Sequence, residues 1–232
     1  MTSPLLVCGH ANVETVLRLD APALDPAGSV IPDGLSLNVS GVGVNLVRGL
    51  GALGSPVRLL TLLGDDVAGR TVRAELRGCD LRVVPVRATA QTLAVTRADG
   101  THVFHRDPKA LPDAPAPIEA FRAALPGCRA ALMTNIGWTR GLLPLARAAG
   151  VPVLTDVQEL RAPDHAYDQP YLRGADVLLF SAARLDDPAA ALRAVGARAR
   201  ADVIVAGLGV GGALLWTRET GEVRNQPAFP AR

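Results

Sequence analysis

The sequence predicts an α/β protein. A mostly parallel sheet is covered by helices on both faces, and a separate small antiparallel sheet projects from it. Short apolar runs with β-branched residues alternate with helical stretches of about ten or more residues, which is the pattern of βαβ units. Glycine follows most of the helical stretches and serves there as a helix stop. Residues 15–39 and 87–106 break this rhythm with alternating apolar and polar positions, which indicate antiparallel strands.

The elements of the α/β part can be placed along the chain from these patterns. Strands are expected near residues 5–9, 57–63, 81–86, 130–134, 151–155, 176–180, 202–206 and 213–217. Helices are expected near residues 42–53, 66–77, 117–125, 140–149 and 188–199. Asp99-Gly100 occupies a hairpin position within 87–106. Because ligands of open α/β sheets bind beyond the carboxyl ends of the strands, we expect the small sheet to be a lid.

Length and charge limit the class of partner. At 232 residues, nearly half of them apolar, the chain is expected to form one α/β domain over residues 1–232 with a small appendage. The 24 basic and 22 acidic residues are spread along the chain, so neither nucleic acid nor a membrane surface is expected as a partner. Lys109 is the sole lysine and lies in no glycine-rich loop, which excludes a Walker A motif. A small molecule is the expected partner.

The cysteines and the first residues bear on the compartment. Cys8, Cys79 and Cys128 are widely spaced and odd in number, so we expect neither a disulfide framework nor a zinc site. The first four residues lead directly into an apolar strand pattern without a basic start or a long apolar run. A cytoplasmic protein is expected.

The first candidate site is Gly9-His10-Ala11-Asn12-Val13-Glu14, where the opening strand ends. Asn12 offers donors and an acceptor, and Glu14 offers a charged acceptor, a combination that suits sugar hydroxyls. A turn with solvated side chains explains the same residues.

The second candidate site is Ser40-Gly41-Val42-Gly43-Val44-Asn45, directly before a helical pattern. Gly41 and Gly43 would let a ligand approach the backbone, and Asn45 would project from the first helical turn toward Asn12. A dinucleotide fingerprint is the competing interpretation, but the third glycine is missing.

The third candidate is the acidic pair Asp65-Asp66, which precedes the helix expected at 66–77. Either carboxylate can cap that helix, and this structural role is favoured over metal binding.

These segments resemble the PfkB family of sugar and nucleoside kinases. The run from Asn38 to Gly78 resembles the first signature of that family, and Gly9 to Glu14 resembles its opening Gly-x-x-Asn-x-Asp, with Glu14 in place of Asp. The resemblance implies a ribokinase-like three-layer fold, transfer of the terminal phosphate of ATP to a sugar hydroxyl, and magnesium as the counterion. It also implies that Asn12, Glu14, Gly41, Gly43 and Asn45 contact the sugar, and that a dimer forms through the lid.

The same resemblance assigns the nucleotide side. Thr155-Asp156-Val157-Gln158 is similar to the Asp-x-Asn of the family, although a helix cap is an equally good explanation of Asp156. Ser181 and Arg184 stand where the family has Asn-x-x-Glu. Arginine does not bind magnesium, but it can pair with a phosphate.

The nucleotide side also includes a glycine-rich turn, residues 207–212. Gly207, Gly209 and Gly212 follow the strand expected at 202–206, and their backbone amides are expected to line the nucleotide. Gly207 replaces the family's threonine. A hairpin without a ligand is the alternative.

No catalytic base is assigned. The family takes its base from a Gly-Ala-Gly-Asp motif, which does not occur in these 232 residues. We therefore expect either a C-terminally incomplete kinase or a non-catalytic homologue that binds sugar or nucleotide.

Overall fold

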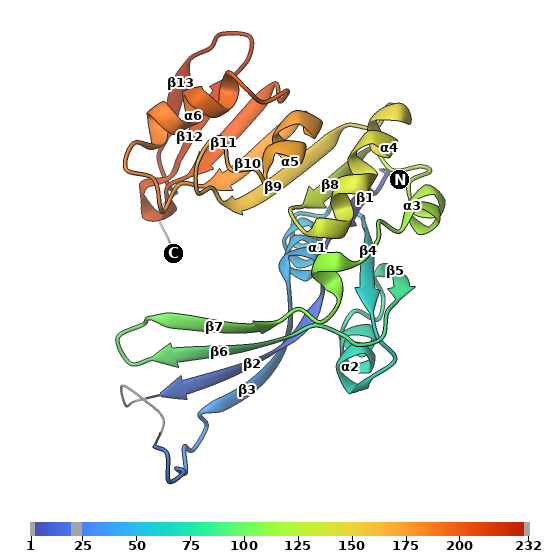
Figure 1. Ribbon diagram of the computed structural model, residues 1–232, viewed down its shortest axis with the longest axis vertical. Helices are drawn as coiled ribbons and strands as arrows, with labels where there is room; N and C mark the ends of the chain where they lie inside the picture. Colours follow the sequence, from blue (N-terminus) through green and yellow to red (C-terminus); the bar gives the residue numbers. More distant parts are fainter. Residues whose placement is uncertain (1–2, 20–24, 230–232) are drawn as a thin grey trace.

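The computed structural model describes residues 3–19 and 25–229 and contains one large sheet with helices on its faces (Figure 1). Among these residues the sheet has nine strands in the order β13-β12-β11-β10-β9-β8-β1-β4-β5. Their bounds are β1 (Leu5–Cys8), β4 (Val57–Leu63), β5 (Asp80–Pro85), β8 (Ala130–Thr134), β9 (Val153–Glu159), β10 (Val177–Ser181), β11 (Val203–Gly207), β12 (Ala213–Thr217) and β13 (Val223–Gln226).

The strand order places a switch point between β1 and β8. From β1 the chain continues through β4 and β5 on one side, and later returns through β8, β9, β10 and β11 on the other. All pairings from β5 to β11 are parallel, and β12 and β13 extend the sheet antiparallel. Open α/β sheets bind their ligands at such a point, outside the carboxyl ends of the strands.

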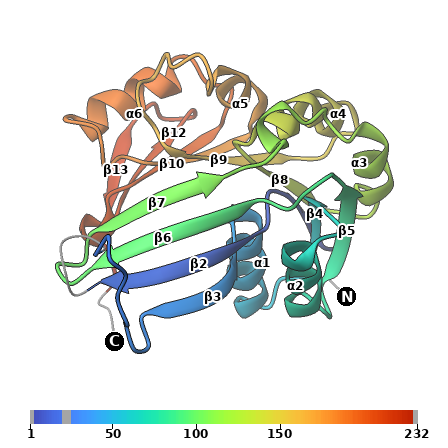
Figure 2. The same ribbon diagram turned by 60° about the horizontal axis from the view of Figure 1, so that its bottom comes forward.

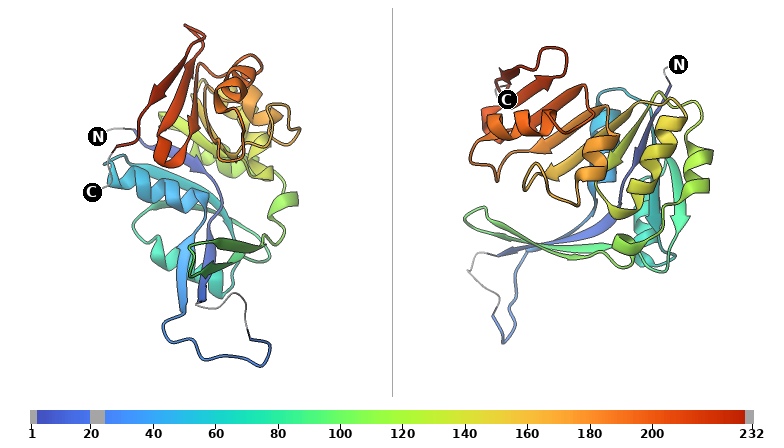
Figure 3. Two further views of the ribbon diagram at one scale, coloured as in Figure 1. Left: turned by 90° about the vertical axis from the view of Figure 1, so that its left-hand side faces the viewer. Right: turned by 45° about the horizontal axis from the view of Figure 1, so that its top comes forward.

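Helices cover both faces of the sheet, as predicted (Figure 3). The helices α1 (Val42–Ala52) and α2 (Val67–Glu75) pack against one face, and α3 (Ile118–Ala124), α4 (Leu143–Ala148), α5 (Gln169–Gly174) and α6 (Pro188–Gly196) pack against the other. Each face carries its own cluster of buried apolar side chains, the first with α1 and α2 and the second with α3 to α6. Side chains along β1 alternate between the two faces, so Leu5 and Val7 belong to the first cluster and Leu6 and Cys8 to the second.

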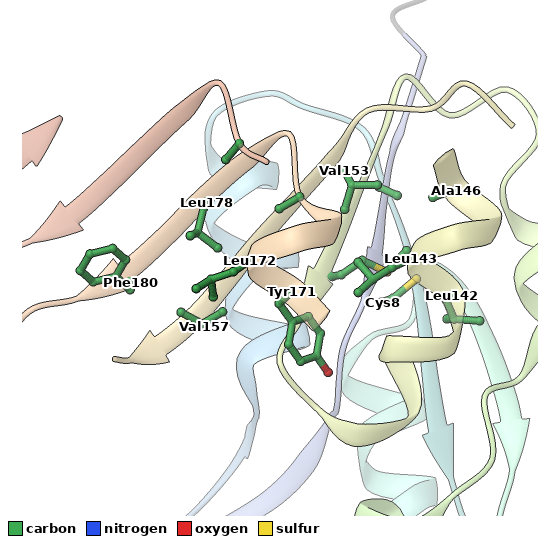
Figure 4. Close-up of a cluster of buried hydrophobic side chains, with 14 of the residues drawn as sticks. Cys8, Leu142, Leu143, Ala146, Val153, Val157, Tyr171, Leu172, Leu178 and Phe180 are labelled. Atoms are coloured by element: carbon green, nitrogen blue, oxygen red, sulfur yellow. The ribbon is translucent and has the colours of Figure 1, made fainter. Parts of the chain in front are cut away.

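The second cluster is the larger core, and α4 and α5 close it (Figure 4). Leu143 of α4 and Tyr171 and Leu172 of α5 are almost fully buried. They share this cluster with Leu178 and Phe180 of β10. Burial of these apolar side chains holds the short helix α5 against the sheet.

The lid is a separate four-stranded sheet that projects from the carboxyl ends of the large sheet (Figure 2). Its strands are β2 (Asn12–Leu19), β3 (Leu35–Ser40), β6 (Gln91–Arg97) and β7 (His102–Asp107), in the order β3-β2-β6-β7. Residues 20–24, which belong to the predicted lid segment 15–39, lie outside the described residues. The predicted hairpin is confirmed: Gly100 has a φ of +82° and its amide donates to the carbonyl of Arg97.

The predicted α/β class is confirmed, with several local differences. The two middle lid strands, β2 and β6, pair parallel, whereas each pairs antiparallel with its outer neighbour, β3 or β7. The strand predicted at 151–155 continues to Glu159, and the helix predicted at 140–149 begins as a 3₁₀ turn, η2 (Gly137–Leu142). Neither α5, which has six residues, nor the polar edge strand β13 was predicted.

The three cysteines are free thiols. Within residues 3–19 and 25–229, no helix has the length and apolar character needed to cross a bilayer.

Candidate functional site

A cavity of about 240 Å³ lies where the lid meets the carboxyl ends of β1, β8 and β9. It therefore lies at the switch point of the sheet. Polar side chains reach the cavity from two directions. The end of β1 and the lid contribute His10, Asn12, Gln91, Thr92, Arg106 and Asp107. The segments that follow β8 and end or follow β9 contribute Asn135, Gln158 and Tyr167. Ala90, Pro108, Leu111, Pro112, Ile136 and Gly137 supply the rest.

Asn12 is the best-buried polar residue of this cavity, with 3% of its surface exposed. Its Nδ2 donates to Oγ1 of Thr92 over 2.9 Å, which joins the root of β2 to β6. Its Oδ1 is buried and has no hydrogen-bond partner among the described residues. An unmade bond of this kind costs about 1–3 kcal/mol, so a ligand hydroxyl that donates to Oδ1 would be favoured.

Glu14 belongs to a row of polar side chains that crosses the lid. Glu14 pairs with Asn38 on one side and with Thr92 on the other, and Thr92 pairs with Arg106. Residues in register point to the same face of a sheet, and Asn12, Thr92 and Arg106 all line the cavity. This face is called the inner face below. Neither Glu14 nor Arg106 forms an ion pair within the described residues, so a carboxylate and a guanidinium remain available to a ligand.

Gly41 and Gly43 allow the start of α1 to approach the chain after β1. A Cβ on Gly43 would lie 2.9 Å from the carbonyl carbon of Gly9 and from the carbonyl oxygen of His10. A Cβ on Gly41, whose φ is +108°, would lie 2.9 Å from Oδ1 of Asn12. These glycines therefore have an architectural role next to the cavity, in addition to the ligand approach that the sequence predicts.

Asn45 lies apart from the cavity. It is exposed on the first turn of α1, and its amide donates to the carbonyl of Gly41 over 2.9 Å. Its side chain is not among those that line the cavity. The structure thus brings Asn12 and Gly41 together but leaves Asn45 outside this group.

A hydrogen-bonded pair forms the wall opposite the lid. Nε2 of Gln158 donates to Oδ1 of Asn135 over 2.7 Å, and Nδ2 of Asn135 donates to the carbonyl of Val157 over 2.8 Å. Gln158 has a φ of +61°, a conformation that residues other than glycine rarely adopt. The hydroxyl of Tyr167 donates to the carbonyl of Asn135, and the guanidinium of Arg140 lies 3.8 Å from the centre of the Tyr167 ring. This wall is therefore held by its own contacts before a ligand binds.

Asp156 does not cap a helix, so that alternative is wrong. It lies inside β9, accepts a hydrogen bond from the amide of Gln158 over 2.7 Å, and is followed by α5 only at Gln169. Burial raises the pKa of the Asp156 carboxyl, and the bond from Gln158 opposes this rise. The hydrogen bond from the Gln158 amide holds the carboxylate next to the positive-φ backbone of that residue.

His10 contributes a neutral imidazole to the cavity. Burial lowers its pKa from 6.5, and the positive charge of Arg106 lowers it further. The ring can therefore both donate and accept a hydrogen bond near pH 7.

The predicted nucleotide residues gather at the carboxyl ends of the adjacent strands β10 and β11. Ser181 ends β10, Gly207 ends β11, and the two pair in register. Arg184 follows β10, and its Nε lies 2.7 Å from Oε2 of Glu159 at the end of β9. Gly209 starts a 3₁₀ turn between β11 and β12. This group and the cavity therefore both lie at the carboxyl ends of the parallel strands.

The glycine-rich turn is also required by packing. Gly212 has a φ of +89°, and a Cβ there would lie 2.1 Å from the carbonyl oxygen of Gln226. β11 and β12 pair antiparallel, so this turn connects the two strands of a hairpin.

The comparisons with known proteins find structures of the same architecture. A microbiome-derived acarbose kinase superposes with a TM-score of 0.85 at 22% identity over 100% of this chain and 78% of that one. Giardia lamblia ribokinase does so with a TM-score of 0.80 at 15% identity over 99% and 76%. The chain has the ribokinase-like fold. These two structural neighbours are sugar kinases by name, so the resemblance found in the sequence is confirmed at the level of the fold.

Further similarities concern ligands and sequence. Arabidopsis thaliana ribokinase, solved with ribose and ATP, matches with a TM-score of 0.76 at 19% identity over 100% of this chain and 80% of that one. In sequence, the chain is 28% identical to the acarbose 7(IV)-phosphotransferase of an Actinoplanes species, over 97% of this chain and 76% of that protein. No family model matches the sequence.

Within the ribokinase-like fold, Asp66 has the predicted capping role. Its Oδ1 accepts from the amide of Gly69 in α2 over 2.7 Å, and its Oδ2 accepts from the amide of Thr89 over 2.8 Å. Burial alone would raise its pKa, but the hydrogen bonds from Thr89 and Gly69 outweigh burial and lower it. Asp65 is 97% exposed at its side chain and lies 3.9 Å from Arg70. Asp66 therefore has a structural role, whereas Asp65 makes only an exposed contact with Arg70.

Six polar residues that line the cavity were not predicted from the sequence: Gln91, Thr92, Arg106, Asp107, Asn135 and Tyr167. Asn135 had a usable signal, because it is the first polar side chain after the strand predicted at 130–134. Thr92 and Arg106 reach the cavity only through the register of the lid strands. Tyr167 lies between β9 and α5 in a segment without a recognisable pattern.

Proposed function

We propose that this chain binds a carbohydrate in the cavity beneath the lid and serves as the sugar-binding part of an ATP-dependent carbohydrate kinase. The observation that carries the proposal is the buried Oδ1 of Asn12, which has no hydrogen-bond partner among the described residues, in a cavity that Arg106 also lines. Glu14 follows two residues later on the same face of β2, but it is not among the residues that line the cavity. Such a set suits a neutral ligand rich in hydroxyl groups. The acarbose kinase and ribokinase neighbours support a sugar as that ligand.

On the sugar side, Asn12 would accept from one hydroxyl and Glu14 from another. Glutamate is one methylene longer than the aspartate usual in the family, so the hydroxyl that it grips lies farther from β2. Gly41 and Gly43 would bring the amides of α1 close to the sugar, and Asn45 would reach it only if the sugar extends over the first turn of α1.

On the phosphate side, ATP would lie along the ends of β10 and β11. The amides of Gly207, Gly209 and Gly212 would line the nucleotide, with Ser181 as a hydroxyl donor. Arg184 would exchange its bond with Glu159 for a phosphate, which accepts two hydrogen bonds from a guanidinium. The common edge of the two groups supports direct transfer from ATP to the sugar.

The described residues offer few side chains that could coordinate magnesium. Residues 3–19 and 25–229 hold no group of three or more His, Cys, Asp or Glu side chains suited to a metal. Glu159, the carboxylate at the end of β9, is engaged by Arg184. We propose that magnesium arrives on the phosphates of ATP, in which mode it needs few protein ligands.

Catalytic turnover requires a group that accepts the proton of the sugar hydroxyl. None of the residues that line the cavity is assigned this role here. A non-catalytic sugar- or nucleotide-binding homologue of the fold is therefore the second candidate, favoured by Ser181 and Arg184 in place of the family's Asn and Glu.

A phosphate-transfer assay with ATP over a panel of sugars and nucleosides tests the proposal. It should be run on this chain and on a version extended through the downstream codons, with Arg184→Gln as the matched variant on the phosphate side. We expect transfer to a sugar in at least one form. If calorimetry detects sugar binding but neither form transfers phosphate, the kinase proposal fails and the binding homologue stands.

We further propose a cytoplasmic homodimer formed through the lid. Part of the face opposite the inner face is apolar and exposed: Leu37 and Leu35 are 62% and 67% exposed, and Leu93 and Val103 are 36% exposed, whereas Val13 and Val39 of the same face are buried against the body. Two such faces would cover each other. Leu37→Asp should convert a dimer to a monomer in sedimentation equilibrium, whereas a wild-type chain that sediments as a monomer would rule the proposal out.

A further inference from the structure

Gln158 lies in a β-bulge at the carboxyl end of β9. Over a stretch in which β10 advances by two residues, β9 advances by three, from Asp156 to Glu159, so β9 holds one extra residue there. Within this bulge Gln158 has a φ of +61°. A bulge turns a side chain out of the regular alternation of its strand, and bulges are common beside active sites. Here the bulge accompanies a glutamine that lines the cavity.

The backbone of Gln158 is strained, and its side chain adds nothing to the core. A positive φ strains any residue that has a Cβ, and glycine is the usual residue at such a position. Gln158 is exposed, so burial of its side chain does not offset the strain. Val157, one residue earlier, is 1% exposed and packs in the large core (Figure 4). A glutamine in place of glycine therefore indicates that its side chain is used at the cavity.

The amide of Asn135 orients the side chain of Gln158. Nδ2 of Asn135 donates to the carbonyl of Val157 over 2.8 Å and lies 3.5 Å from Oδ1 of Asp168. Because these two acceptors hold Nδ2, the Oδ1 of Asn135 faces Gln158 and accepts from its Nε2 over 2.7 Å. Among the described residues no donor reaches the other end of this amide, Oε1 of Gln158. That oxygen is available to a ligand.

Asp168 supports this orientation instead of capping its own helix. It is the N-cap residue of α5, where an aspartate usually accepts a bond from the first turn, yet its side chain makes no such bond. Its carboxylate is 4% exposed, with Oδ1 toward Asn135 and Oδ2 3.0 Å from Nδ1 of His165. A buried carboxylate needs donors of this kind. A buried negative charge therefore stands behind the Asn135 amide.

The cavity thus has an amide oxygen on each of two opposite walls. Oδ1 of Asn12, on the lid side, is buried and has no hydrogen-bond partner among the described residues, and Oε1 of Gln158 stands on the sheet side. Amide oxygens only accept hydrogen bonds, so a ligand that contacts both must donate at both places. Two hydroxyl groups meet this requirement, whereas an ether oxygen or an ionised phosphate does not.

We propose that Gln158 is a ligand-binding residue whose Oε1 accepts from a second hydroxyl of the sugar, opposite the hydroxyl that donates to Asn12. The substrate therefore carries two hydroxyls that donate to opposite walls of the cavity. This inference rests on the proposed carbohydrate function and adds a specificity-determining contact to the same site.

Binding calorimetry on the full chain tests the contact with acarbose, D-ribose and D-glucose as probes. Gln158→Gly removes the side chain together with the backbone strain, and Gln158→Met removes the amide but keeps the length. Asp33→Gly is the matched control, because Asp33 is also exposed, has a φ of +54° and is not among the residues that line the cavity. Asn12→Ala and its combination with Gln158→Met test for two separate hydroxyl contacts. Thermal unfolding gives the Tm of every variant.

We expect both Gln158 variants to weaken binding of the probe that the wild type binds most tightly by about three- to tenfold, the loss of one hydroxyl contact. The double variant should lose affinity by the product of the two single losses, because contacts at separate hydroxyls are independent. Gln158→Gly and Asp33→Gly should each raise Tm by about 1–4 °C, because glycine adopts a positive φ without strain. Asp33→Gly should leave binding unchanged.

Three results would overturn the contact while the proposed function stands. They are equal binding by the wild type and both Gln158 variants, a double variant that binds as well as Asn12→Ala, and a Gln158→Gly variant that loses Tm together with affinity. The last would give Gln158 a structural role instead. If no carbohydrate probe binds the wild type, the proposed function fails and the contact fails with it.

Discussion

Asp66 shows how one side chain ties the α/β body to the lid. Its carboxylate accepts from Gly69 at the start of α2 and from Thr89, two residues before β6 begins. The sequence predicted the cap, because an acidic residue directly before a helical pattern is a local signal. The bond to Thr89 spans 23 positions, and no local pattern indicates it.

The substitution Asp66→Ala should lower the free energy of unfolding by about 1–2 kcal/mol, since it removes a helix cap and leaves the Thr89 amide unpaired. Urea denaturation at pH 7 measures the change. Asp65→Ala is the matched control and should change stability by less than about 0.5 kcal/mol. Equal effects of the two substitutions would contradict the assignment. Because the pKa of Asp66 is lowered, its stabilisation should disappear as the pH falls through that pKa.

His10 makes the free energy of unfolding depend on pH near neutrality, at higher pH than Asp66 does. Its folded-state pKa is below 6.5, so the unfolded chain binds the proton more readily once the pH falls below 6.5. The free energy of unfolding should therefore decrease between pH 7.5 and 5.5. In His10→Asn this decrease should be smaller, whereas His105→Asn, an exposed position on β7, should keep it. An identical pH dependence in wild type and His10→Asn would refute the role of burial and Arg106.

At the scale of elements, α1 owes its position to glycines rather than to side-chain contacts at its start. Gly43 faces the backbone of Gly9 and His10, and no side chain caps the helix at Gly41. The sequence indicated a close approach here from the glycine spacing, but the nearest partner in the structure is the chain itself.

Two of the three glycines in α1, Gly43 and Gly49, should therefore respond to substitution in opposite directions. Gly43→Ala should lower the free energy of unfolding by about 1–3 kcal/mol, because its Cβ would overlap the chain after β1. Gly49→Ala, in the same helix with open space around it, should raise it by about 0.5–1 kcal/mol. Thermal or urea unfolding of the pair measures both. A loss of stability in Gly49→Ala, or none in Gly43→Ala, would contradict the packing described here.

At the scale of the whole molecule, the parallel sheet was predictable and the lid was only partly so. Alternating strands and helices dictate a parallel sheet, and its helices cover both faces as expected. The parallel pairing of β2 with β6 joins segments about 80 residues apart, and this pairing brings Thr92 to Asn12. Asn12 could thus be found in the sequence, but its partner Thr92 and the neighbouring Arg106 could not.

The central claim is that a carbohydrate binds at Asn12 beneath the lid. Isothermal titration of acarbose and D-ribose into the wild type, Asn12→Ala and Thr15→Ala tests it most directly, with thermal unfolding as the check on folding. Thr15 is the matched control, because it lies on β2 but on the opposite face of the lid. We predict that at least one of the two sugars binds the wild type, that Asn12→Ala weakens this binding about tenfold or more, and that Thr15→Ala leaves it unchanged. Absence of binding by either sugar, or equal binding by all three proteins, would contradict the account.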